Sequence, residues 1–319
     1  MRVLVAEPLG REGLQLLRRE HEVDERLNLT RDEFLAALPD YDALLVRSQV
    51  KVDAEAISAG PRLIVVGRAG VGTDNIDLEA ATRAGIAIVN APTANTIAAA
   101  EMTLALIYAL ARHVPAADAS TRRAEWRRAD FVGTELAGKT LGIVGLGKIG
   151  LAIAKRAQAM DMSLLASDPY VSPDVAVNAG VRMVELPELL AQADVVTLHV
   201  PLTEKTRGMI GAADLALLKP TALLVNVARG GVVDEAALAE ALTAGRLAGA
   251  AIDVYEHEPP RGSELFAAPN TVLTPHLGAS TSEAQDKVSI EVAEQVLDVL
   301  AGRPARFQVN RPLAGAASN

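Results

Sequence analysis

The sequence predicts an α/β fold built on parallel sheets, and three observations carry this prediction. Short β-branched runs alternate with helical patterns almost throughout the 319 residues. These runs are continuously hydrophobic rather than alternating, which is typical of parallel strands covered by helices on both faces. The chain is also about twice the length of a typical single domain, and 50% of it is hydrophobic, so it can bury the cores of two domains.

Each predicted strand is a short buried run followed by a helical pattern. In chain order the predicted strands are Val3–Ala6, Ala43–Arg47, Leu63–Gly67, Ile86–Asn90, Thr140–Gly145, Ser163–Asp168, Val195–Val200, Ala222–Ala228, Ala250–Val254 and Thr271–Pro275. A strand, a helix and a second parallel strand are joined by a right-handed crossover, so this order predicts doubly wound sheets.

The helices between these strands have recognisable starts and stops. Thr30 and Glu33 have the spacing of a capping box, and Asp234 precedes an Ala- and Leu-rich helical run. Gly245 and Gly302 lie where two helices should end.

Two longer helices, predicted at Thr96–Arg112 and Thr281–Leu300, suggest a division into two lobes. The first follows a break at residues 90–95 and precedes a new series of strands. The second closes the chain before a tail of small residues after Leu313. We interpret both helices as connectors between the lobes, with the final segment returning to the first lobe.

Composition excludes several classes of partner. Lys and Arg number 31 against 40 Asp and Glu, a net charge of −9, and no basic run is present, which argues against nucleic acid or an anionic membrane. The chain has no Cys, which excludes disulfides and thiolate metal sites, and no His and acid spacing indicates a metal. The N-terminal apolar run is too short for a signal peptide, and Met102–Ala111 is half a membrane span, so a cytoplasmic location is expected.

The sharpest motif is Gly145-Leu-Gly147-Lys-Ile-Gly150, between a predicted strand and a helix expected at Lys148–Met160. The first glycine permits the tight turn, the second allows a pyrophosphate to approach the backbone, and the third lets helix and strand pack closely. The helix N-terminus offers free N–H donors and a positive dipole end to the phosphates.

An acid in the expected place accompanies the motif. Asp168 lies 168 − 150 = 18 positions after the last glycine, at the end of the next strand, where a carboxylate can bind ribose hydroxyls. Pro169 and Tyr170 follow it, so no Arg is placed to neutralise a 2′-phosphate, and NAD is favoured over NADP. The alternative is a Gly-rich turn beside an ordinary surface Asp.

Further polar side chains follow later strands, at the edge where open α/β sheets place ligands. Arg229 comes directly after a buried strand and could meet a carboxylate with both arms of its guanidinium, although a surface Arg is the commoner outcome. His276 follows a strand and Pro275, so its ring could be aimed at a substrate, or it could be a hydrogen-bonded structural residue. His199 precedes Pro201, and we expect it to line the cofactor crevice.

Together these motifs resemble the D-isomer-specific 2-hydroxyacid dehydrogenase family over essentially the entire chain. Within it, the run from Gly67 to Asp77, the Asn95–Glu101 region and Trp126-Arg-Arg128 look most like the D-3-phosphoglycerate dehydrogenase branch. The resemblance implies two Rossmann-like domains, with a cofactor domain at 96–284 inserted in a substrate domain at 1–95 and 285–319. It also implies a homodimer or homotetramer.

The resemblance assigns roles to individual residues. His276 is the implied general acid/base, Glu258 its partner, with Glu256 as an alternative, and Arg229 the substrate anchor. The implied NAD contacts are Gly145, Gly147, Lys148, Ile149, Gly150, Asp168, His199, Val200, Pro201, Ala228 and Asp253. The implied substrate contacts are Arg47, Arg68, Val71, Gly72 and Arg128.

The implied reaction is hydride transfer between NAD and a D-2-hydroxy acid, most readily D-3-phosphoglycerate in serine biosynthesis. Two departures bear on the substrate: Val50 stands where branch members often carry a hydroxyl, and Val227 where a small polar residue or Cys is common. The chain ends soon after the last helix, so we expect no regulatory domain and no feedback by serine. The alternatives are a glyoxylate/hydroxypyruvate or D-lactate-type reductase and, from another class, an NADH-sensing binding module of the same fold.

Overall fold

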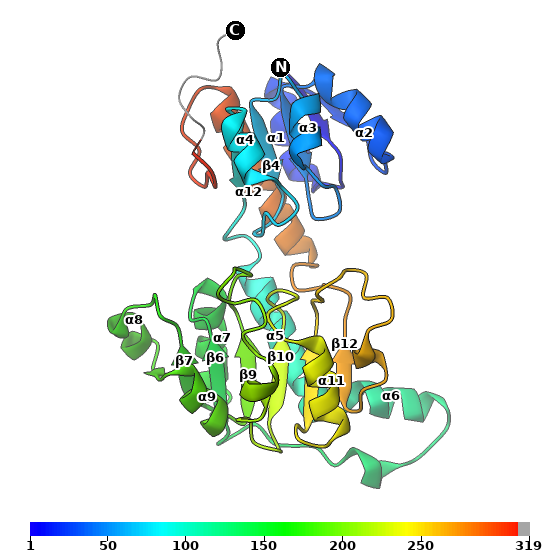
Figure 1. Cartoon of the computed structure of the whole chain (residues 1–319), viewed down its shortest axis with the longest axis vertical. Coiled ribbons are helices and arrows are strands. Elements are labelled where there is room, and N and C mark those ends of the chain that lie inside the picture. Colours follow the sequence, from blue (N-terminus) through cyan, green and yellow to red (C-terminus); the bar gives the residue numbers. More distant parts are fainter. Residues whose placement is uncertain (312–319) are drawn as a thin grey trace. The chain divides into compact units, whose positions relative to one another are not determined.

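The computed structural model describes residues 1–311, and the chain divides into two compact units (Figure 1). Residues 1–95 and 280–319 form one, here called the five-strand unit, and residues 96–279 form the seven-strand unit. The division after residue 279 falls slightly earlier than the expected one after residue 284. The tail after Leu313 lies outside the described residues.

The five-strand unit is built on a fully parallel sheet. Its strands are β1 (Arg2–Val5), β2 (Glu22–Glu25), β3 (Ala43–Val46), β4 (Val65–Arg68) and β5 (Ala87–Asn90), in the order β2-β1-β3-β4-β5. The chain winds first toward β2 and then, from β3, in the opposite direction. The switch point of this doubly wound sheet therefore lies between the carboxyl ends of β1 and β3.

Helices cover both faces of this sheet. On one face, α1 (Arg11–Glu20) packs against α12 (Ser282–Leu300), and both contribute to a core that includes Leu17 and Val292. The other face carries α2 (Arg31–Ala37), the 3₁₀ turn η1 (Leu38–Asp40), α3 (Ala54–Ala59) and α4 (Leu78–Arg83). Thr30 caps α2, and the capping box predicted with Glu33 is confirmed.

The seven-strand unit has the order of a dinucleotide-binding sheet. Its strands are β6 (Thr140–Val144), β7 (Ser163–Ser167), β8 (Arg182–Met183), β9 (Val195–Leu198), β10 (Leu223–Asn226), β11 (Gly249–Ile252) and β12 (Thr271–Leu273). They lie in the order β12-β11-β10-β9-β6-β7-β8, all parallel. This is the Rossmann order with one strand added, and its switch point lies between β6 and β9. The predicted fold class is confirmed.

Two layers of helices enclose this second sheet (Figure 1). One layer contains α5 (Thr96–Ala111), α7 (Lys148–Gln158) and α8 (Pro173–Asn178), and the other α9 (Leu186–Gln192), α10 (Ala212–Leu215), α11 (Glu235–Thr243) and η3 (Glu264–Phe266). The elements α6 (Val114–Arg122) and η2 (Arg128–Phe131) follow α5. Within residues 1–311 no single helix is long and apolar enough to cross a membrane; α5 and α6 pass that test only as a pair bent by 61°. Half of α5 is buried, Leu106, Ile107 and Leu110 included, in the core of the sheet.

All the predicted strands are present, and the structure adds two that were not predicted. Both additions, β2 and β8, lie at a sheet edge, where a strand needs no continuous apolar run. The sequence of β2 is Glu-Val-Asp-Glu, which carries no hydrophobic signal. Gly245 and Gly302 have φ of +67° and +72° just beyond α11 and α12, which confirms the predicted helix ends.

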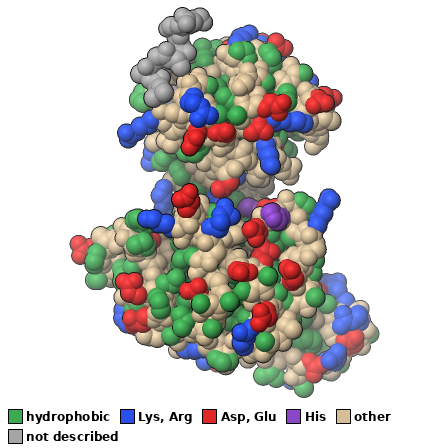
Figure 2. Space-filling view, in the orientation of Figure 1, with side chains coloured by type: hydrophobic (Ala, Val, Ile, Leu, Met, Phe, Trp, Pro, Cys, Tyr) green, Lys and Arg blue, Asp and Glu red, His purple; other side chains and the backbone are tan. Residues whose placement is uncertain are grey.

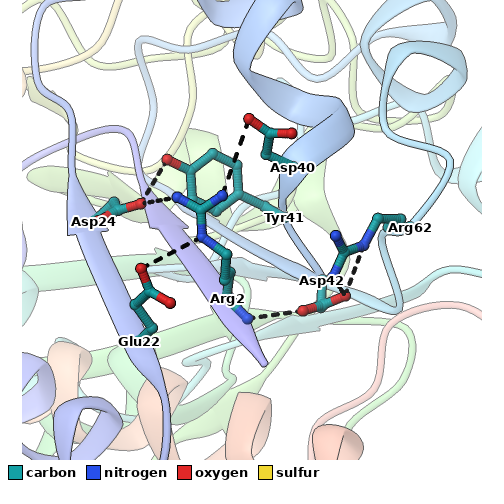
Figure 3. Close-up of polar contacts among 7 residues, drawn as sticks. All are labelled: Arg2, Glu22, Asp24, Asp40, Tyr41, Asp42 and Arg62. Atoms are coloured by element: carbon teal, nitrogen blue, oxygen red, sulfur yellow. Dashed lines mark hydrogen bonds and ion pairs between the residues drawn. The ribbon is translucent and has the colours of Figure 1, made fainter.

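A polar network fixes the amino ends of β1 and β3 in the five-strand unit (Figure 3). The Arg2 guanidinium donates to Asp24 over 2.8 Å and lies 4.8 Å from the centroid of the Tyr41 ring. The buried Asp42 carboxylate accepts from the Arg2 backbone N–H and from Arg62. On the face shown in Figure 2, basic side chains lie among acidic ones on both units, so the acidic excess does not form a single acidic face in this view.

Candidate functional site

In the seven-strand unit, every predicted catalytic residue follows a strand at the same edge of the sheet. Parallel strands bring their carboxyl ends together, and β6, β9, β10, β11 and β12 are followed by Gly145, His199, Arg229, Asp253 and His276 respectively. Open α/β sheets bind their ligands at this edge. The candidate site is therefore built from these five connections.

The three glycines of the Gly-rich turn have different physical reasons to be glycine. Gly145 has φ of +92°, and a Cβ there would lie 2.7 Å from the carbonyl oxygen of His199. A Cβ on Gly150 would lie 2.3 Å from the carbonyl oxygen of Gly145. A Cβ on Gly147 would meet nothing within 4 Å. Packing within the protein thus requires glycine at positions 145 and 150. It does not require glycine at position 147, and the close approach of a ligand would explain the residue there.

The surroundings of the turn fit a dinucleotide. Gly147 is the N-cap of α7, so the backbone N–H groups at the start of this helix face outward, and both Gly147 and Lys148 are exposed. The Asp168 carboxylate accepts from the Leu146 N–H over 2.8 Å and from the Tyr170 N–H over 2.8 Å. Asp168 therefore joins the end of β7 to the turn, beside the helix N-terminus.

The connection after β9 lies on the other side of the Gly-rich turn. The backbone of His199 and the side chain of Val200 lie against Gly145 across the switch point, and Pro201 is exposed beyond them. Burial lowers the pKa of His199 to about 3, so its ring is neutral, and its Nε2 lies 2.8 Å from the Thr197 hydroxyl. A neutral histidine bonded inside the sheet suits a wall of the crevice rather than a proton carrier.

Substitution of the glycines tests this division of roles. Gly147→Ala is expected to leave the melting temperature unchanged and to weaken NADH binding about tenfold or more, since a methyl group would overlap a bound pyrophosphate. Gly150→Ala is expected to lower the melting temperature, because its methyl group meets backbone. Thermal denaturation and a fluorescence titration with NADH measure both effects. Equal NADH affinity in Gly147→Ala and the wild type would contradict the assignment of the turn.

His276 and Glu258 form a direct pair. The His276 Nδ1 lies 2.7 Å from Glu258 Oε2, and the other carboxylate oxygen accepts from the Tyr255 N–H over 3.2 Å. The pair is partly open, with 44% of the His276 side chain and 38% of the Glu258 side chain exposed. The alternative partner Glu256 has no such contact among the described residues; its N–H donates to Glu235.

The backbone of His276 is held in an unusual conformation. Its φ is +55°, which a residue with a side chain adopts only when its surroundings impose it. The His276 N–H donates to the Asp253 carbonyl over 2.8 Å, and the N–H groups of Leu277 and Gly278 donate to the Asp253 carboxylate over 2.7 and 2.8 Å. These three hydrogen bonds fix the loop after β12 to Asp253 and so set the orientation of the imidazole.

These contacts show how Asp253 holds the loop. Its side chain has no exposed surface, and both carboxylate oxygens accept hydrogen bonds from residues 274–278. Asp253 thus holds the backbone that carries His276, and its predicted contact with the cofactor stays a prediction.

Arg229 lies on a turn whose shape is set by Asn226 and Gly230. The buried Asn226 side chain accepts from the Ala228 N–H and donates to the Arg229 carbonyl, both over 3.0 Å. A Cβ on Gly230 would lie 1.8 Å from the Tyr255 carbonyl oxygen, so this turn is pressed against the segment that leads to Glu258. Ala228 and Val227 are buried beneath it. The sequence therefore brings Arg229 to the same edge as the His276–Glu258 pair.

The pKa of Glu258 reports this proximity. Partial burial acts to raise it, but the hydrogen bond and charge of His276, the Tyr255 N–H and the Arg229 charge outweigh burial and lower the pKa. The carboxylate is therefore ionised at neutral pH, and its contribution to stability is present above its unfolded-state pKa and lost as the pH falls through the lower folded-state value. An ionised carboxylate only accepts, so Nδ1 of His276 carries the proton and Nε2 offers a lone pair.

The predicted substrate contacts in the five-strand unit also follow strand ends. Arg47 comes after β3, and its N–H donates to Glu7 over 2.6 Å. Arg68 ends β4, and its guanidinium lies against Gly70, where a Cβ would come within 1.6 Å of it. Val71 and Gly72 follow in a loop held by Asn90, whose Nδ2 donates to the Val71 carbonyl over 2.7 Å. Val50 packs against the core of this unit.

Arg128 belongs to the seven-strand unit. It begins η2, an exposed segment beyond α6 in the seven-strand unit. Trp126 beside it is 81% exposed, although it is the one tryptophan of the chain.

Sequence reasoning missed the side chains that shape the site without facing it. Asn226, Glu7 and Asn75 each bond the backbone of a loop at a strand end. For Asn226 and Glu7 the available signal was a polar residue in or next to a buried strand, because such a group must find a partner. Asn75 lies in a turn and gave no such signal.

With this geometry established, comparison with known proteins identifies the family. Residues 104–278 match the family described as D-isomer specific 2-hydroxyacid dehydrogenase, NAD binding domain. The chain belongs to this family. The family confirms the predicted NAD cofactor, since its matched domain carries NAD binding in its description.

Individual members of the family are similar over nearly the whole chain. The D-3-phosphoglycerate dehydrogenase of Archaeoglobus fulgidus is 48% identical over 98% of this chain and 60% of its own length. That of Mycobacterium bovis is 50% identical over 97% and 58%. A solved glyoxylate reductase from Paecilomyes thermophila has a TM-score of 0.88 at 32% identity, covering 97% of this chain and 98% of its own. The chain thus spans about 60% of the length of the curated relatives it matches.

Proposed function

We propose that the chain is an NAD-dependent dehydrogenase that oxidises D-3-phosphoglycerate to 3-phosphohydroxypyruvate, a step of serine biosynthesis. The observation that carries the proposal is the His276–Glu258 pair with Arg229 at one edge of a Rossmann sheet. The curated D-3-phosphoglycerate dehydrogenases at 48% and 50% identity support this substrate. We assign cofactor binding to the seven-strand unit and substrate binding to the five-strand unit.

NAD supplies the hydride acceptor when it is bound. The chain's own residues bind the substrate and move one proton. Nε2 of His276 takes the hydroxyl proton as the C2–H bond breaks, and Glu258 stabilises the imidazolium that results. Arg229 holds the substrate carboxylate and polarises the developing carbonyl oxygen. In the reverse direction the imidazolium returns the proton to that oxygen.

The phosphate of the proposed substrate requires positive charge. Arg47, Arg68 and Arg128 are assigned to it, with the backbone N–H groups of Val71 and Gly72 serving the carboxylate. Arginine suits this role because its guanidinium binds phosphate oxygens in pairs. The carboxylate of Asp168 beside the Gly-rich turn carries the same sign of charge as a 2′-phosphate and repels it, so we assign NAD rather than NADP.

The experiment that tests the substrate compares kcat/KM for D-3-phosphoglycerate, D-glycerate and D-lactate with NAD, and for the matching 2-oxo acids with NADH. A clear preference for the phosphorylated compounds supports the proposal. A preference for hydroxypyruvate, glyoxylate or pyruvate would replace it with a reductase of that type. Tight NADH binding with negligible turnover of every acid would favour a binding module instead.

Glu258→Gln tests how the acid acts. It removes the negative charge that stabilises the imidazolium while keeping an acceptor of the same shape. The kcat for oxidation is therefore expected to fall about tenfold, since the imidazolium formed as the proton is accepted loses its charged partner. An unchanged kcat would show that Glu258 does not act through His276.

A homodimer or homotetramer also belongs to the proposal. Exposed apolar side chains gather on and after α6: Val114 at 53%, Trp126 at 81% and Val132 at 79%. Large exposed apolar side chains are candidates for an interaction surface, and Arg128 lies between them in the sequence. Sedimentation of the wild type and of Trp126→Glu is expected to show a dissociated variant with reduced activity. A fully active monomer would exclude a role for Arg128 across the interface.

The proposal includes no nucleic-acid or membrane partner, because a chain of net charge −9 is repelled by polyanions. A cytoplasmic location accompanies it and can be tested by cell fractionation.

A further inference from the structure

A buried acid holds the loop that carries Arg47. Glu7 lies two residues after the end of β1 and is 7% exposed. Its carboxylate accepts hydrogen bonds from three backbone N–H groups of one loop: Arg47 over 2.6 Å, Gln49 over 3.1 Å and Val50 over 3.2 Å. Hydrogen bonds to an ionised acceptor are the stronger kind, so this single side chain anchors most of the loop.

The same loop is bonded from its other side. The Nδ2 of Asn75 donates to the Arg47 carbonyl over 3.0 Å and to the Val50 carbonyl over 2.7 Å. Residues 47–50 belong to no helix or strand. Glu7 and Asn75 thus supply the partners that a sheet or helix would otherwise give to this backbone.

Packing supports the loop on one side only. Gln49 and Val50 line a cavity of about 390 Å³ whose other walls include Leu29, Arg31 and Phe34. A loop beside an open cavity lacks neighbours there, so its position depends on hydrogen bonds more than on contact with a core.

The location of the loop connects it to ligand binding. Glu7 follows β1 and Arg47 follows β3, which are the two strands that flank the switch point of the five-strand sheet. Open α/β sheets bind ligands in the crevice at such a point. Because the Glu7 carboxylate accepts three N–H groups of the loop itself, it faces the backbone of the loop and leaves the Arg47 side chain available to a ligand.

We propose that Glu7 is a positioning residue of the substrate site: it fixes the 47–50 loop so that Arg47 meets the phosphate of the substrate. This inference rests on the proposed function, since it takes D-3-phosphoglycerate as the ligand of Arg47. Glu7 itself does not touch the substrate.

The test is Glu7→Gln, which keeps the shape of the side chain and removes its charge and one acceptor. The KM for D-3-phosphoglycerate is expected to rise about tenfold, the factor that corresponds to the loss of one charge-assisted hydrogen bond, with a smaller change in kcat. Hydrogen exchange measured by mass spectrometry is expected to quicken in residues 44–52. Glu7→Asp, which retains the charge, is expected to lie between the wild type and Glu7→Gln.

Asp42→Asn is the matched control. Asp42 is 8% exposed and accepts a backbone N–H of the same sheet (Figure 3). It lies just before the amino end of β3, whereas the 47–50 loop follows the carboxyl end of that strand. It is expected to lower the melting temperature as Glu7→Gln does, without raising the KM or the exchange of residues 44–52.

Three outcomes would overturn the inference. The first is unchanged exchange in Glu7→Gln, and the second is faster exchange with an unchanged KM. The third is an equal rise in KM in Asp42→Asn, which would reduce the effect to general destabilisation. Failure of the wild type to oxidise D-3-phosphoglycerate would instead overturn the proposed function, and faster exchange in Glu7→Gln would then still support its hold on the loop.

Discussion

Replacement of His276 by Ala is expected to lower kcat for D-3-phosphoglycerate oxidation by about 10²- to 10⁴-fold, the range typical of a lost general acid/base. The reason is geometric: Nδ1 is bonded to an ionised carboxylate, which leaves Nε2 as the ring nitrogen that accepts the hydroxyl proton. The KM for NAD is expected to stay near the wild-type value, because the Gly-rich turn follows β6 whereas His276 follows β12. Steady-state kinetics near neutral pH measure both quantities.

His257→Ala is the control for this substitution. His257 is an exposed histidine that precedes Glu258 in the same connection, and it has no place in the proposed proton transfer. Its removal is expected to leave kcat within about twofold of the wild type, as for most exposed side chains. If His276→Ala retained most of its activity, or if both variants lost it equally, the proton transfer would have to be assigned elsewhere.

The fold was largely predictable because its signals are local and repeated. Each interior strand of a doubly wound sheet is buried on both faces, and a run such as Ala43–Val46 is therefore apolar throughout. The strand β2 was not predicted because it lies at the side of the sheet, where only one neighbouring strand covers it, and its sequence Glu-Val-Asp-Glu has no apolar run. An outermost strand therefore lacks the apolar pattern by which an interior strand is predicted from sequence.

The candidate site was predictable only in part, for a similar reason. Residues that follow strands, such as Arg229 and His276, could be placed at one edge from the strand pattern alone. The pairing of His276 with Glu258 rather than Glu256 depends on the path of the segment after β11, which brings the Glu258 carboxylate to His276. The hold of Asp253 on the 274–278 loop could not be predicted, because its burial under that loop depends on the tertiary fold.

Arg229→Ala is expected to lower kcat/KM for the hydroxy acid by about 10²- to 10³-fold, the loss measured when one donor to a developing oxyanion is removed. Arg229→Lys keeps the charge but loses the planar pair of donors, so it is expected to recover only part of that loss. NADH affinity is expected to remain near the wild-type value in both variants, because the turn at Gly145–Gly150 is untouched.

The fixed turn around Arg229 makes this prediction specific. Asn226 and Gly230 hold the backbone through contacts that do not involve the guanidinium, so the Ala variant is expected to fold with a melting temperature close to that of the wild type. Arg246→Ala is a matched surface variant: Arg246 is exposed in the same unit and pairs only with Glu240 among the described residues. Activity lost equally in Arg246→Ala, or retained in Arg229→Ala, would remove Arg229 from the substrate site and leave the hydroxy acid without its anchor on the His276 side.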